Sequence, residues 1–166
     1  MASAILAADY ITALGLGRFT PIQVLKLAYI SHGYTLAITG RPLFPDRIEA
    51  WEHGPVIPNI YHAVVIHGLA PVPRLYACGT PVGGERMEKR RDEIGEVLGP
   101  NKRAIVEKTV KTYGDYAGFQ LSYITHMEGT PWRCAFRPGK GYEEIKDEDL
   151  KKYYKGQMGR GAGRSS

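Results

Sequence analysis

Apolar residues recur at helical spacing in several stretches of this chain, and polar or glycine-rich segments separate those stretches. The first stretch predicts a helix over residues 3–14, with Ser3 as its N-cap and Gly15 at its end. Residues 20–23 offer a threonine N-cap, a proline at the first helical position and a glutamine three residues after the cap. They predict a second helix, and its wide apolar stripe indicates that it is covered on most sides.

The same spacing predicts further helices along the rest of the chain. Pro58 and Gly68 bound one over residues 58–67, and Ala117 opens another over residues 117–126. Asn101 is expected to cap a helix that ends before Gly114, and Asp147 to cap the last helix.

Two segments read instead as short strands. Residues 47–51 and 74–78 hold enough β-compatible side chains to form strands that pair as a small sheet against the helices. The charged run over residues 85–93 mixes both signs and is expected to be a solvated face. The predicted fold is therefore mainly α (α+β), a helical bundle with a small two- or three-stranded β element.

Length and composition indicate one ordinary globular domain. A chain of 166 residues can bury a single core, and its 43% apolar and 23% charged residues are typical of soluble proteins. We expect one domain over residues 1–155 and a disordered basic Gly/Arg/Ser tail over residues 156–166. With no leader-like start and no apolar run of about 20 residues, the cytoplasm is the expected location and a membrane is not.

The residues that commonly carry chemistry do not form a catalytic or metal-binding pattern. The two cysteines lie far apart, no phosphate-binding loop or nucleophile motif is present, and the histidines lack metal-ligand spacing. These histidines are His32, His53, His62, His67 and His126. We predict no catalytic residues, no metal and no cofactor.

Two histidines leave alternatives open. His126 either caps the end of its helix, the interpretation we favour, or acts with Glu128 as an acid–base pair. His53 either stabilises the turn at Gly54-Pro55 or contacts a partner.

The net charge of +5 permits acidic partners without identifying one. Basic residues gather in the C-terminal tail, yet no predicted helix has the dense basic stripe of a recognition helix. We therefore expect a solubilising tail and no nucleic-acid partner.

Three stretches of sequence together resemble one family. The first is Lys26-Leu27-Ala28-Tyr29-Ile30-Ser31-His32-Gly33-Tyr34, followed by residues 38–44. The second runs from Glu49 through Trp51, Gly54 and Pro55 to Pro58 and Tyr61, and the third covers residues 121–132. In this order they resemble the Panacea domain, also described as the SocA-like or GepA-like antitoxin domain. Tyr34 stands where the family often has Trp, and His53 where an aromatic residue is frequent.

The resemblance implies a small cytosolic protein of bacteria, prophages or phages that neutralises a protein toxin by binding it. Members of the family face unrelated toxins, and some are thought to deliver a toxin to a protease. The leading hypothesis is therefore an antitoxin that blocks its toxin by direct contact. The alternatives are a protease adaptor and a small hydrolase that uses His126 and Glu128.

Large aromatic residues beside turn prolines are expected to frame a buried corner, and their exposed neighbours to contact a partner. The structural motif residues are Trp51, Gly54, Pro55, Pro131 and Trp132. The candidate partner-binding residues are Glu52, His53, Tyr61, His126 and Glu128.

Overall fold

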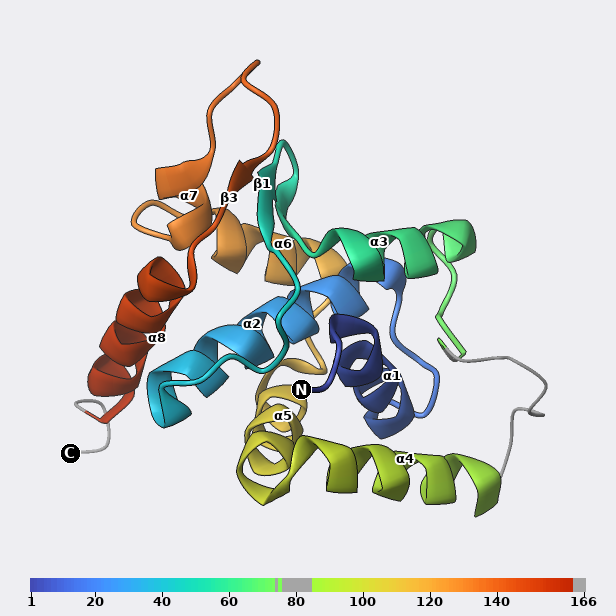
Figure 1. The fold of residues 1–166 in the computed structure, drawn as a ribbon. Helices are drawn as coiled ribbons and strands as arrows, with labels where there is room; N and C mark the ends of the chain where they lie inside the picture. Colours follow the sequence, from blue (N-terminus) through green and yellow to red (C-terminus); the bar gives the residue numbers. More distant parts are fainter. Residues whose placement is uncertain (74, 76–84, 163–166) are drawn as a thin grey trace.

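The computed structural model describes residues 1–73, 75 and 85–162, and their helices surround a long central helix, α2 (Figure 1). The helices are α1 Ala4–Leu14, α2 Pro21–Thr39, α3 Pro58–Val64, α4 Glu85–Leu98, α5 Pro100–Tyr113, α6 Gly118–His126, α7 Pro131–Ala135 and α8 Asp147–Ala162, with a 3-10 turn, η1, at Val65–His67. The strands are β1 Glu49–Trp51, β2 Gly54–Val56 and β3 Glu143–Glu144. The predicted fold class, mainly α with a small β element, is confirmed.

Helix α2 is central because its sequence leaves almost no polar face. It contacts α1, α3, α5, α6 and α8, and most of its side chains are buried. The predicted capping box is present: the Thr20 hydroxyl accepts from the Gln23 N–H, and the Gln23 side chain accepts from the Thr20 N–H. At the other end Gly40 adopts a left-handed conformation (φ 71°) and stops the helix.

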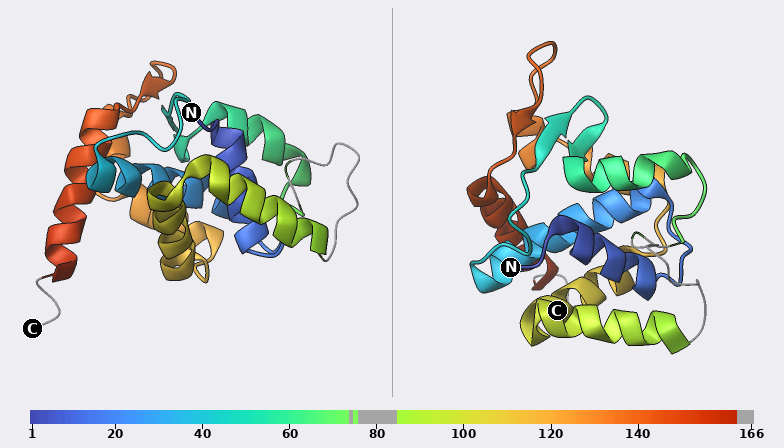
Figure 2. Two further views of the ribbon diagram at one scale, coloured as in Figure 1. Left: turned by 60° about the horizontal axis from the view of Figure 1, so that its bottom comes forward. Right: turned by 45° about the vertical axis from the view of Figure 1, so that its right-hand side comes forward.

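The remaining elements lie on opposite sides of α1 and α2. The small sheet lies on one side and the connected pair α4 and α5 on the other, while α8 stands at one end (Figures 1 and 2). The His32 side chain, buried in α2, stacks on Phe44 with ring centroids 4.3 Å apart, and its Nε2 lies 2.9 Å from Asp147 Oδ1. This contact joins the start of α8 to the middle of α2.

The sheet is antiparallel, in the order β2-β1-β3. Trp51 pairs with Gly54 and Ala50 with Pro55, so the strand predicted over residues 47–51 is present as β1 and the Gly-Pro pair begins a second strand. A proline fits here because β2 is an edge strand and its missing N–H has no ladder bond to make.

The predicted partner strand at residues 74–78 lies, except for Leu75, outside the described residues. Among the described residues, β1 has β2 and β3 as its two neighbours. The signal for β3 was too weak to find, since only two exposed glutamates pair there.

Helices α4 and α5 differ from the sequence prediction. The charged run at residues 85–93 belongs to α4, whose apolar side chains Ile94 and Leu98 anchor it, while Glu88 is exposed as expected. Helix α5 begins at Pro100 with Gly99 as its N-cap, in place of Asn101, because proline suits the first helical position.

Helix α8 continues to Ala162, past the expected start of a disordered tail at residue 156. Three acidic residues in its first turn and Arg160 in its last complement the helix dipole, and this favours the helix despite its glycines. Residues 163–166 lie outside the described part of the chain.

Gly33 is a close approach point between α2 and α8, and its replacement tests this packing. A Cβ at Gly33 would overlap the buried ring of Tyr154, so Gly33→Ala should lower the free energy of unfolding by about 1–3 kcal/mol. The control is Gly159→Ala on α8, which meets no atom within 4 Å and should stabilise the helix by up to about 1 kcal/mol. Urea unfolding measures both, and an unchanged midpoint for Gly33→Ala would show that the helices do not meet there.

Candidate functional site

The hairpin of β1 and β2 carries a cluster of aromatic rings. The half-buried Trp51 ring stacks on Tyr142, with centroids 4.4 Å apart and planes 20° apart, and meets Tyr61 edge-on at 4.9 Å. Its indole N–H donates to Glu49 Oε2 at 2.8 Å. These contacts join α3, β1 and the chain segment before β3 into one corner.

A second tryptophan ties α7 to the same hairpin. Pro131 occupies the first turn of α7, and the Thr130 hydroxyl caps the helix by accepting from the Arg133 N–H. The buried Trp132 side chain donates from Nε1 to the Trp51 carbonyl at 2.7 Å and stacks on Phe136. Trp132 therefore fixes the backbone of β1 as well as filling space.

A buried lysine lies beneath the hairpin. Lys26 belongs to α2, is only 3% exposed, and donates from Nζ to the Pro55 carbonyl at 2.9 Å. Gly54 passes directly over it with φ 121°, and a Cβ there would lie 2.6 Å from both Lys26 Nζ and His126 Cε1. Only glycine fits this position, because both the conformation and the space exclude a side chain.

The surroundings change the proton affinity of both basic groups. Burial lowers the pKa of Lys26 to about 7, since the charged amino group loses its water. Burial also lowers the pKa of His126, and the nearby Lys26 and His53 contribute in the same direction, while the bond to Ser122 opposes them.

The five candidate partner-binding residues divide into exposed and half-buried groups. The side chains of Glu52 and His53 are exposed at the hairpin turn, and that of Glu128 is exposed after α6. Tyr61 is half-buried against Trp51. Glu52 and His53 are neighbours in the hairpin turn, whereas Glu128 lines the groove between α2, α5, α6 and α8.

His126 and Glu128 make separate contacts. The Nδ1 atom of the half-buried His126 bonds to the Ser122 carbonyl in the last turn of α6, and its ring lies against Trp132. Glu128 forms an ion pair with Arg133 at 3.2 Å. Within the described residues no hydrogen bond joins His126 to Glu128.

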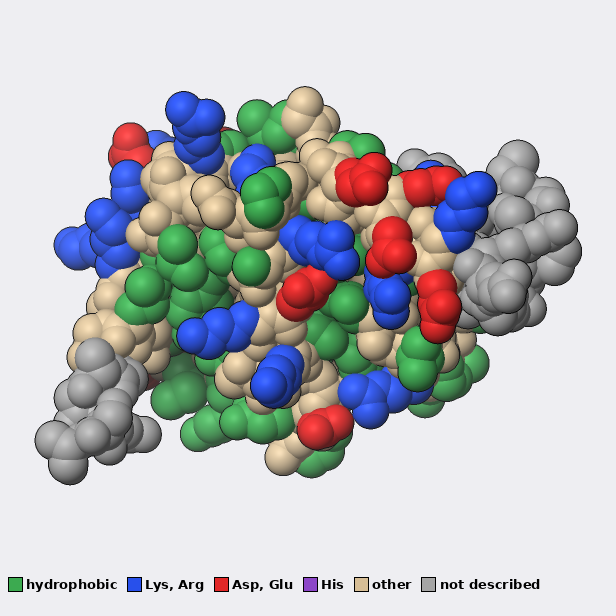
Figure 3. Space-filling model, turned by 90° about the horizontal axis from the view of Figure 1, so that it is seen from below, with side chains coloured by type: hydrophobic (Ala, Val, Ile, Leu, Met, Phe, Trp, Pro, Cys, Tyr) green, Lys and Arg blue, Asp and Glu red, His purple; other side chains and the backbone are tan. Residues whose placement is uncertain are grey.

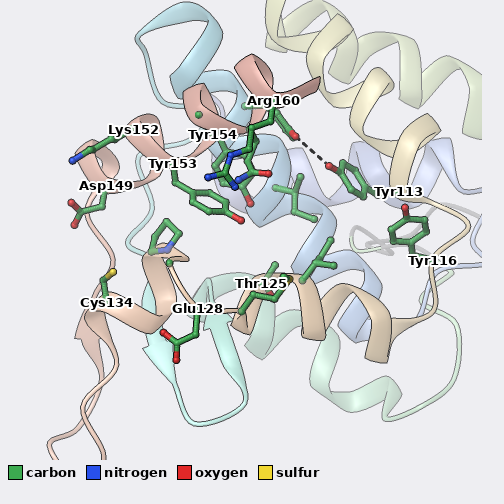
Figure 4. Close-up of a pocket in the computed structure, with 18 residues that line it drawn as sticks. Tyr113, Tyr116, Thr125, Glu128, Cys134, Asp149, Lys152, Tyr153, Tyr154 and Arg160 are labelled. Carbon is green, nitrogen blue, oxygen red and sulfur yellow. Dashed lines mark hydrogen bonds between the residues drawn. The ribbon is translucent and has the colours of Figure 1, made fainter. Parts of the chain in front are cut away.

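A groove of about 660 Å³ lies between α2, α5, α6 and α8 (Figure 4). Its walls carry five tyrosines, Tyr34, Tyr113, Tyr116, Tyr153 and Tyr154. Two of their hydroxyls, on Tyr34 and Tyr113, lie 3.2 Å apart, and burial raises the pKa of Tyr113, Tyr153 and Tyr154. No local pattern in the sequence predicted this groove, because its tyrosines come from α2, α5, the segment before α6 and α8, and only the fold brings them together.

The described residues contain neither a metal-binding cluster nor a membrane-spanning helix. Between residues 1 and 162, apart from the undescribed gaps, no three His, Cys, Asp or Glu side chains gather as a metal site. None of the described helices is long and apolar enough to cross a bilayer.

The hairpin, the buried Lys26 and the bond from Trp132 to Trp51 hold together the three sequence motifs in one small helical domain. The family model for the SocA-like antitoxins, the Panacea domain, matches residues 24–133, and the chain therefore belongs to this family. These bounds begin within α2, take in the hairpin and α6, and end within α7.

The chain is also similar to the protein named Antitoxin SocA from Caulobacter vibrioides (strain NA1000 / CB15N). The two sequences are 28% identical over 111 residues, which is 67% of this chain and 56% of that relative. The similarity thus spans little more than half the relative's length. No solved structure matches the chain.

The buried Lys26 should make stability depend on pH. In the unfolded chain a lysine titrates near its ordinary value of 10.5, whereas in the fold its pKa is about 7. Between these values the unfolded state binds more protons, so the free energy of unfolding should rise with pH, by roughly 2 kcal/mol from pH 7 to pH 9. Urea unfolding across this range measures the slope.

Lys26→Met should flatten this slope, while Lys89→Met, at an exposed position on α4, should leave it intact. If Lys26→Met kept the full slope, Lys26 would not be the group that titrates.

Proposed function

We propose that this protein is an antitoxin that neutralises a protein toxin by binding it directly. The observation that carries the proposal is membership of the SocA-like Panacea family, matched over residues 24–133. The similarity to a protein named as an antitoxin supports it. The toxin would be the product of a partner gene in a toxin–antitoxin system, and the protein would act in the cytoplasm without catalysis.

The use of the motif residues supports a binding role. Trp132, Lys26 and His126 have their polar atoms engaged inside the protein, as donor to Trp51, donor to Pro55 and partner of Ser122. These residues stabilise the domain, and their hydrogen-bonded polar atoms are not available to bind a substrate. Glu52, His53 and Glu128 remain exposed and are proposed as polar contacts at the edge of the toxin interface, with Tyr61 and His126 supporting them.

Co-expression with the product of the adjacent open reading frame tests the proposal. Expression of that product alone should stop growth, and co-expression of this protein should restore it. The two purified proteins should also elute together in gel filtration, because neutralisation rests on a stable contact. The cellular level of the toxin should stay unchanged when growth is restored.

Continued growth arrest with both proteins soluble would contradict the proposal. Restored growth accompanied by loss of the toxin, and dependent on an active protease, would instead favour the adaptor mechanism. The empty vector is the control for expression of this protein. The destabilised Gly33→Ala variant is the control for the dependence of neutralisation on a stable fold.

A further inference from the structure

Helix α6 exposes a row of large apolar side chains. Phe119 is 75% exposed and Tyr123 68% exposed, one helical turn apart, and Met127 follows at 46%. On the opposite side of the same helix Leu121 and Thr125 are buried against the core. Large exposed apolar side chains gathered in one place typically mark an interaction site.

This row continues into the tyrosine-lined groove. Met127 and Tyr116 both line the groove, so the row and the groove form one surface, which we name the α6–α8 face. Seen from below, apolar side chains lie in a hollow on the left of the view, and cationic side chains border it (Figure 3). The surface is therefore apolar in its middle and charged at its edge, as protein interfaces are.

The polar groups in the groove include tyrosine hydroxyls, which donate and accept hydrogen bonds, and the Arg160 guanidinium, which only donates. Arg160 lies over the tyrosines, close enough to Tyr153 for its charge to lower the pKa of that hydroxyl, although burial dominates and raises it (Figure 4). Among the described residues Arg160 forms no ion pair. Asp149 and Lys152 lie at the rim and point away from the tyrosines, and Glu128 is paired with Arg133. The groove thus presents the Arg160 cation and tyrosine hydroxyls, while its two lining carboxylates are directed away from the tyrosines (Asp149) or paired with Arg133 (Glu128).

We propose that the α6–α8 face is the main docking site for the protein partner. The partner would place large apolar side chains on Phe119 and Tyr123 and in the groove, with a carboxylate reaching Arg160. A small molecule would leave Phe119 and Tyr123 uncovered, since these side chains are not among the residues that line the groove. The net charge of +5 is also complementary to an acidic partner segment. This inference rests on the proposed antitoxin function.

The test measures binding of the purified product of the adjacent open reading frame to variants of the full chain, by isothermal titration calorimetry. The double variant Phe119→Ser/Tyr123→Ser and, separately, Arg160→Glu should each raise Kd by roughly tenfold or more, as loss of an interface anchor does. The matched controls are Ile66→Ser, an 85% exposed apolar residue elsewhere, and Lys155→Glu on α8 outside the groove. Both controls should keep Kd within about twofold.

Thermal melting curves check that each variant is folded. We expect every variant to fold, because the replaced side chains are exposed. Unchanged Kd in the folded α6 and Arg160 variants would overturn the docking site while leaving the antitoxin function standing. A larger rise in Kd from Glu52→Lys/His53→Glu than from the α6 and Arg160 variants would overturn it too, because the main contact would then lie on the hairpin. A wild-type dimer that the double variant converts to a monomer would assign the face to a second copy. A wild-type chain that neither binds nor neutralises would overturn both proposals.

Discussion

The interaction on which the family motifs depend is the bond from the buried Lys26 amino group to the Pro55 carbonyl. It joins the central helix α2 to an edge strand and requires Gly54, because no side chain fits over the lysine. Once the hairpin is held there, the Trp51 carbonyl faces Trp132 and receives its N–H. One buried amino group thus links α2, the hairpin and α7, which are distant in sequence.

This arrangement separates the residues that build the domain from those proposed to bind the toxin. The motif side chains are engaged with one another, and their pKa values are set by burial. Two of the exposed apolar side chains, Phe119 and Tyr123, lie on α6 beside the groove. Different surface residues on a common frame would let related proteins bind unrelated toxins, because the frame does not depend on them.

The sequence predicted those elements whose boundaries have local chemical signals. The capping box at Thr20 and the proline at the start of α3 act within one turn of helix, so the start of each helix can be predicted from residues adjacent in the sequence. Helix α4 was missed because charged residues dominate it and only its packing on α1 and α5 shows which side is inside. Strand β2 was missed because Gly54-Pro55 ordinarily ends a strand, and only the lysine beneath explains its place. The groove depends on tyrosines from four segments and had no local signal.

The division between a supporting hairpin and a binding α6–α8 face is tested most directly by NMR chemical shifts of the isotope-labelled chain on addition of the toxin. We expect the largest changes along α6, at Phe119 and Tyr123, and at Arg160, with smaller changes at Glu52 and His53 and little change in strands β1 and β2. Large changes confined to the hairpin, with α6 and Arg160 unmoved, would contradict the account.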